Sequence, residues 1–121
     1  MKMKEWIGVD LDGTLAKYDK FRGIHHIGEP IPEMKDRVMR WIEQGHLVKI
    51  FTARVSDPEA INPIIDWLIK HEIGYTDKGY LQPLEITNVK DFGMSELWDD
   101  RAVGVEPNTG RPLSASRRGL K

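Results

Sequence analysis

The feature that most constrains the fold is a short apolar run near the start of the chain that ends in two acidic residues. Residues 6–9 are mostly apolar, and Asp10 and Asp12 follow directly. The run predicts a buried β-strand that delivers both carboxylates to its carboxyl end. Open α/β sheets bind their ligands at that end, so we expect a functional site at Asp10 and Asp12.

The residues after the strand suit a tight, chemically active turn. Gly13 gives the backbone freedom for a sharp turn, and the hydroxyl of Thr14 can hold it. Two neighbouring carboxylates repel each other unless a cation or a shared proton lies between them, so bound Mg²⁺ or divergent pKa values are expected. In such a site one carboxylate can attack while the other donates and accepts a proton. The alternative is an ordinary acidic turn, which the preceding strand and the following Thr-Leu disfavour.

The remaining periodicity predicts alternating strands and helices. Apolar residues recur at helical spacing over 33–44, which Gly45 ends, and again over 61–69, where Pro63 is an alternative helix start. Strands are expected at 46–51, 84–89 and 102–105. Strand, helix and strand in succession favour parallel pairing through right-handed crossovers. The pattern therefore predicts an α/β fold with a mainly parallel sheet and helices on both faces.

A second group of candidate residues follows the second strand. Thr52, Ala53 and Arg54 would lie at the same edge of the sheet as Asp10. A threonine hydroxyl with the next backbone N–H can cradle a phosphate oxygen, and an arginine can assist. The alternatives are a threonine that merely ends a strand and an arginine in a surface ion pair.

Two further groups complete the candidate set. Lys90 follows the third expected strand and is the candidate cation for this edge of the sheet, with Lys78 as its rival. Asp99 and Asp100 follow an apolar step. Because consecutive side chains diverge on a strand, one aspartate is expected to meet Mg²⁺ and the other to orient Lys90 or a metal-bound water.

These motifs, in this order, resemble those of the haloacid dehalogenase superfamily. Asp10 to Thr14 resembles its first motif, Phe-Thr-Ala-Arg at 51–54 its second, Lys90 its third, and the paired acids its fourth. The resemblance covers roughly residues 5–106. It implies a Rossmann-like three-layer sandwich. Asp-Asp-Arg at 99–101 is most similar to the phosphatase half of polynucleotide kinase-phosphatases and to small carboxy-terminal-domain phosphatases.

The resemblance also implies roles for these residues. Asp10 would be the nucleophile that forms an aspartyl-phosphate, and Asp12 the general acid and then base. Thr52 would bind the transferring phosphoryl group, and Lys90 would neutralise that group and the nucleophile. Mg²⁺ would be held by Asp10, Asp12 and Asp100, which leaves Asp99 to the supporting role. An aspartate at position 12 favours a phosphatase or phosphotransferase over a dehalogenase.

No gap between the motifs is long enough for the cap domain that many members carry, so we expect a capless, open site. Such a site suits a bulky substrate, namely a nucleic-acid end, a phosphoprotein or a large phosphorylated sugar, or a small substrate enclosed by a neighbouring subunit. Two other classes stay open. One is a non-catalytic module that binds a phosphorylated ligand, and the other is a receiver-like domain in which a long-lived phospho-aspartate signals.

Composition sets the outer bounds. The 121 residues suit one domain over 1–106, with a flap at 16–31 and a basic tail at 107–121. A net charge of −1 marks no general nucleic-acid binder, and the absence of cysteine excludes thiolate chemistry. We expect neither a signal peptide nor a membrane span, and a cytoplasmic location by default. The tail could contact a polyanion, although a solubilising role is the simpler expectation.

Overall fold

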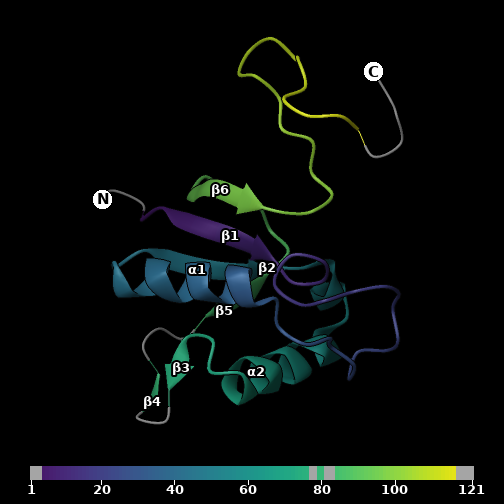
Figure 1. Cartoon of the computed structure of the whole chain (residues 1–121), viewed down its shortest axis with the longest axis vertical. Helices are drawn as coiled ribbons and strands as arrows, with labels where there is room; N and C mark the ends of the chain where they lie inside the picture. The colour runs from purple at the N-terminus through teal and green to yellow at the C-terminus, as the bar shows by residue number, and fades with distance from the viewer. Residues whose placement is uncertain (1–3, 77–78, 81–83, 117–121) are drawn as a thin grey trace.

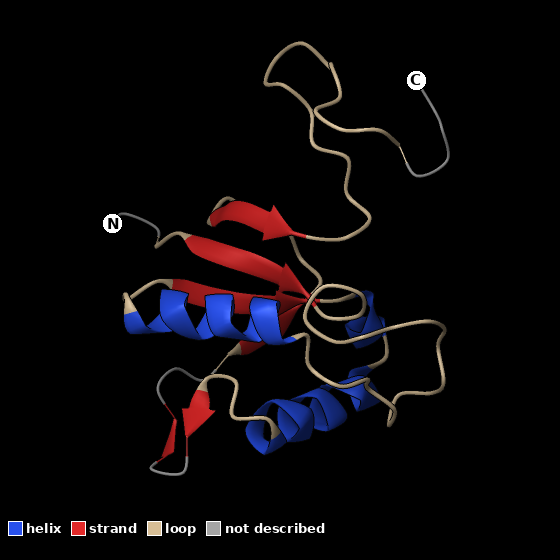
Figure 2. Ribbon diagram, viewed as in Figure 1, coloured by secondary structure: helices blue, strands red, loops and turns tan. Residues whose placement is uncertain are grey.

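A four-stranded, all-parallel sheet forms the centre of the computed structural model (Figures 1 and 2). The structure describes residues 4–76, 79–80 and 84–116. The strands lie in the order β5-β2-β1-β6, so the first strand is central. This confirms the predicted α/β class with a parallel sheet. The strands are β1 (Trp6–Asp10), β2 (Leu47–Phe51), β5 (Glu85–Thr87) and β6 (Met94–Trp98).

Two helices connect the first three strands of this sheet, β1, β2 and β5. Helix α1 (Pro32–Glu43) joins β1 to β2, and α2 (Ile61–Lys70) lies between β2 and β5. Pro63 falls in the first turn of α2, where its missing N–H removes no helical hydrogen bond, so the helix begins before it. The shorter elements are the 3₁₀ turns Ala53–Ser56 and Pro58–Ala60 and the hairpin strands β3 (Tyr75–Thr76) and β4 (Gly79–Tyr80).

The hydrophobic core lies on one face of the sheet. Because side chains alternate along a strand, Val9 and Ile50 point to the same face, where they are fully buried. Val38 of α1 and Leu68 of α2 belong to the same buried cluster. Both helices therefore cover the same face, which is what right-handed crossovers produce when successive strands are added in one direction.

The opposite face carries a short connection in place of the second helical layer that the sequence predicts. Trp6 and Lys49 lie on this face, with the Lys49 ammonium 4.6 Å from the centre of a Trp6 ring. Residues 88–93 join β5 to β6, and Asp91 accepts a hydrogen bond from Trp6 Nε1 at 2.8 Å. A parallel crossover with a helix needs a dozen or more residues, so six cannot supply one. Among the described residues, a three-layer arrangement is not formed.

The last strand lies earlier in the chain than predicted. The sequence pattern predicts a strand at 102–105, but β6 at Met94–Trp98 pairs with β1 instead. Residues 102–105 leave the sheet and lead into a hairpin closed by a bridge between Val105 and Pro112. In Figure 1 this hairpin projects beyond β6. Residues 117–121 of the predicted tail lie outside the described part of the chain.

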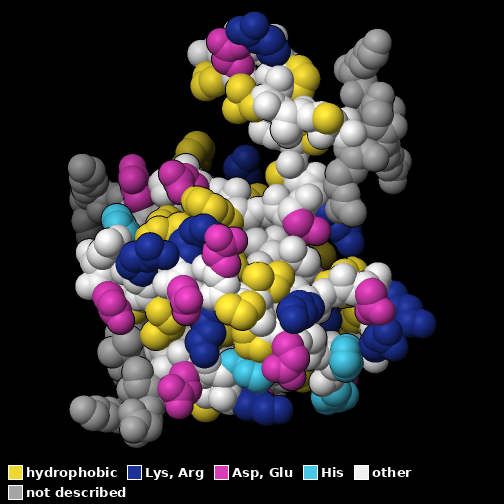
Figure 3. All heavy atoms as spheres, in the orientation of Figure 1, with side chains coloured by type: hydrophobic (Ala, Val, Ile, Leu, Met, Phe, Trp, Pro, Cys, Tyr) yellow, Lys and Arg dark blue, Asp and Glu magenta, His cyan; other side chains and the backbone are white. Residues whose placement is uncertain are grey.

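Side chains of both signs are interspersed over the face shown in Figure 3, without a continuous basic surface. None of the helices in the described ranges is long and apolar enough to cross a membrane.

Candidate active site

The candidate site is a pocket of about 590 Å³ at the carboxyl ends of the central strands. Asp10 ends β1, Thr52 follows β2, and Asp99 follows β6, so parallel pairing alone brings these three residues to one edge. The segment between Ala16 and Ile31 supplies the outer wall. The lining consists of Asp10, Asp12, Tyr18, Phe21, Ile24, Phe51, Thr52, Ala53, Arg54, Ser56, Asp57, Asp99 and Arg101.

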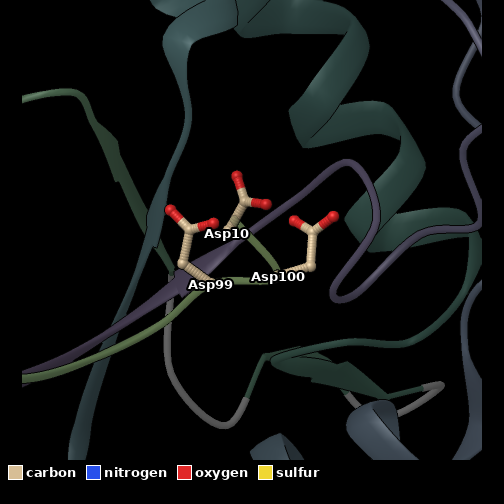
Figure 4. Close-up of side chains that lie close together, drawn as sticks. All are labelled: Asp10, Asp99 and Asp100. Carbon is tan, nitrogen blue, oxygen red and sulfur yellow. The ribbon is translucent and has the colours of Figure 1, made fainter. Parts of the chain in front are cut away.

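Three carboxylates converge at this edge. Asp10, Asp99 and Asp100 each offer an oxygen, and these oxygens lie within 4.8 Å of one another (Figure 4). Carboxylate oxygens in such a group are the donors that Mg²⁺ or Ca²⁺ prefers. Strand alternation predicts that only one of the paired aspartates faces a metal ion. Because both lie just past the end of β6, the alternation of a strand does not separate them.

The turn after β1 brings Asp100 to Asp10. Thr14 Oγ1 lies 3.3 Å from Asp10 Oδ2 and accepts a hydrogen bond from the Asp100 backbone N–H at 3.0 Å. Gly13 has a φ of +91°, and a Cβ there would stand 2.5 Å from Asp100 Oδ2. Glycine therefore suits the positive φ, and its missing Cβ leaves room for the Asp100 carboxylate. The Asp-Gly-Thr turn predicted from the sequence thus positions Asp100 as well as Asp10.

The environment of Asp10 favours its protonated form. Burial contributes most, followed by the negative charge of Asp99 and by a hydrogen bond with Asp100 and its charge, and together they raise the pKa of Asp10 to about 7. The hydrogen bond from Thr14 acts in the opposite direction. Clustered carboxylates share protons or bind a cation, and the raised pKa of Asp10 reflects the repulsion that either would relieve.

This raised pKa predicts how stability depends on pH without metal. The folded chain keeps a proton on Asp10 up to about pH 7, whereas the unfolded chain releases it near 3.8. The contribution of Asp10 to folding therefore falls as the pH rises between these values, by about 2 kcal/mol once solvent screening of this partly exposed group is allowed for. The measurement is the free energy of unfolding of wild type and of Asp10→Asn, in chelator, at pH 4 and at pH 8. From pH 4 to pH 8, wild type should lose about 2 kcal/mol more than the variant. Mg²⁺ at pH 8 should stabilise wild type and have a smaller effect on the variant; parallel pH profiles would contradict the prediction.

Asp12 lies apart from the three-carboxylate group and is bound by Arg54. Arg54 Nε donates to Asp12 Oδ2 at 2.7 Å, and Nη2 donates to Oδ1 at 2.9 Å. The Arg54 side chain is only 6% exposed and that of Asp12 18%. The pair is thus a partly buried, two-pronged ion pair, the geometry in which arginine binds carboxylates most specifically.

Arg54 also fastens the flap. Its guanidinium donates to the carbonyls of Gly23 at 3.4 Å and His26 at 3.0 Å, and it lies 5.3 Å from the centre of the Phe21 ring. From the sequence, Arg54 is expected to be either a phosphate ligand or part of a surface ion pair. The structure places its donors on Asp12 and on the flap, in an ion pair that is partly buried.

Thr52, which is predicted to bind a phosphate oxygen at the end of β2, is held in place by a local hydrogen bond. Thr52 is 2% exposed, and its Oγ1 accepts a hydrogen bond from the Arg54 backbone N–H at 3.2 Å. The hydroxyl hydrogen of Thr52 therefore takes no part in that bond. Thr52 and Ala53 both line the pocket beside Asp10.

The predicted lysine is not brought to the pocket lining. Lys90 is exposed in the connection after β5, and its rival Lys78 lies outside the described residues. Arg101, which the sequence analysis read only as part of Asp-Asp-Arg, does line the pocket. Its backbone N–H donates to Asp99 Oδ1 at 2.8 Å. Its position directly after the paired acids could have identified Arg101 from the sequence as a candidate site residue.

Comparison of the chain with protein-family models, with curated proteins and with solved structures gives no match.

Proposed function

We propose that the protein is a Mg²⁺-dependent phosphohydrolase that cleaves a phosphomonoester through an aspartyl-phosphate, as a capless member of the haloacid dehalogenase superfamily. The observation that carries this proposal is the convergence of Asp10, Asp99 and Asp100 within 4.8 Å beside the buried Thr52. At one edge of the sheet, the partly buried Asp10 carboxylate can attack a phosphoryl group, and the neighbouring Thr52 hydroxyl can bind one of its oxygens.

In the first step an Asp10 carboxylate oxygen attacks phosphorus while the bond from phosphorus to the leaving oxygen breaks. Thr52 holds a phosphoryl oxygen, and Asp12 gives its proton to the departing alkoxide. In the second step Asp12 takes a proton from water, which attacks phosphorus and releases Asp10 and phosphate. Because both Asp12 oxygens accept from Arg54 as a carboxylate, Arg54 must release one of them and Asp12 must take up a proton from solvent before Asp12 can act as the acid.

The donor set fits a hard divalent cation. Asp10, Asp99 and Asp100 would hold it, with Thr14 fixing the position of Asp100. Bound Mg²⁺ supplies positive charge that lets an anionic carboxylate approach an anionic phosphate. This assignment brings Asp99 into the ligand group and leaves Asp12 to acid–base work, where the resemblance placed Asp12 among the ligands.

The test is a turnover screen of the full chain with Mg²⁺ and with chelator. The panel contains aryl phosphate, nucleoside monophosphates, sugar phosphates and oligonucleotides phosphorylated at the 3′ or 5′ end. We expect release of inorganic phosphate that depends on Mg²⁺ for at least one class. Absence of turnover throughout the panel, with ligand binding retained, would favour the phospho-ligand-binding module. A phospho-enzyme that lasts for minutes to hours would favour the receiver-like alternative.

A further inference from the structure

We propose that the pocket selects phosphomonoesters whose leaving group carries a flat aromatic ring, and that this ring lies against Phe21 and Tyr18 of the flap. The inference rests on the proposed function and adds the substrate class. It concerns the outer wall of the pocket, which the reaction at Asp10 does not use.

The outer wall is apolar and aromatic. Phe21 is 57% exposed and Tyr18 38% exposed, and both line the pocket with Ile24 and Phe51. Exposed aromatic side chains that border a concave polar site are typical of ligand contact surfaces. The pocket, at about 590 Å³, has room for a drug-sized ligand and not only for a phosphate group.

The flap that carries these rings is fixed at its base. Ala16 and Pro30 form an antiparallel bridge, and the Lys17 N–H donates to the Glu29 carbonyl at 2.9 Å. Trp67 Nε1 of α2 donates to the Gly28 carbonyl at 2.9 Å. The rings are therefore presented by a preformed loop, which reduces the entropy lost when a ligand binds.

Phe21 is additionally positioned by the guanidinium of Arg54. The Arg54 centre lies 5.3 Å from the ring centroid, and the same guanidinium holds Asp12. One side chain thus links the aromatic wall to the proposed acid–base residue. An aromatic leaving group would sit beside the group that must protonate it, whereas a small sugar phosphate would leave the wall exposed to water.

The test compares two substrates that share the same phosphorylated primary alcohol on the same sugar, adenosine 5′-monophosphate and ribose 5-phosphate. Stacking of one base on aromatic side chains predicts a kcat/KM about tenfold higher for the nucleotide. Phe21→Ala should bring the ratio of the two values close to one, and Phe21→Trp should retain it. Phe92→Ala is the matched control, because Phe92 is fully exposed and does not line the pocket.

Binding separates failure of this inference from failure of the proposed function. Dissociation constants of both compounds are measured on Asp10→Asn, and on Asp10→Asn combined with Phe21→Ala. Tighter nucleotide binding that Phe21→Ala abolishes supports the aromatic wall even if wild type hydrolyses nothing, in which case only the proposed hydrolase is overturned. Equal binding of both compounds, or a ratio of kcat/KM that Phe21→Ala leaves unchanged, overturns the inference and leaves the hydrolase standing.

Discussion

Asp10→Asn is expected to lower kcat at least about 1,000-fold on any phosphomonoester that the wild-type protein hydrolyses. The amide cannot attack phosphorus as a carboxylate does, and it carries no charge to attract the cation at the three-carboxylate group. Asparagine keeps the size of aspartate and removes a charge that Asp99 repels, so the variant should remain folded. The measurement is steady-state release of phosphate at saturating Mg²⁺, with thermal unfolding recorded on the same samples.

The matched control for this variant is Asp36→Asn on the exposed side of α1, outside the pocket. It should leave kcat unchanged, because it makes the same chemical change away from the site. If Asp10→Asn kept more than about a tenth of wild-type kcat while folded, Asp10 would not be the nucleophile. The proposed mechanism would then be replaced by one in which water attacks phosphorus directly.

Arg54→Met is expected to destabilise the protein by about 3 kcal/mol, because it leaves the Asp12 carboxylate with little exposure and no counter-charge. It also removes the donors that reach the carbonyls of Gly23 and His26 on the flap. Methionine is chosen because it preserves much of the apolar length of the side chain. Urea unfolding at pH 7 measures the loss directly.

Two further variants isolate the cause of this loss. Arg54→Met combined with Asp12→Asn should recover part of the stability, because the unpaired charge is gone. Arg22→Met removes a flap arginine whose pair with Asp19 is exposed, and it should change the free energy of unfolding little. Equal losses for Arg54→Met and Arg22→Met would show that the partly buried pair is not what fastens the flap.

The local pattern of the sequence determined the central elements and the first half of the site. Apolar periodicity predicted β1, α1 and β2, since alternating and helical spacing follow from backbone geometry alone. Parallel pairing then implied that Asp10 and Thr52 share an edge, and the structure brings both into one pocket. The Asp-Gly-Thr turn was also predictable from the sequence, because glycine tolerates the positive φ found at Gly13.

Only the tertiary structure decided the rest, because each remaining feature depends on which segments pair across long distances in the chain. The edge beside β1 was taken by Met94–Trp98 rather than by 102–105, and the six-residue connection before it left the second face without a helix. The same placement brought Asp99 and Asp100 together to Asp10. Arg54 pairs with Asp12, which lies 42 positions away in the chain, and no local spacing predicts this partly buried ion pair. Periodicity reports the face on which a side chain lies, whereas its partner is set by packing of the whole chain.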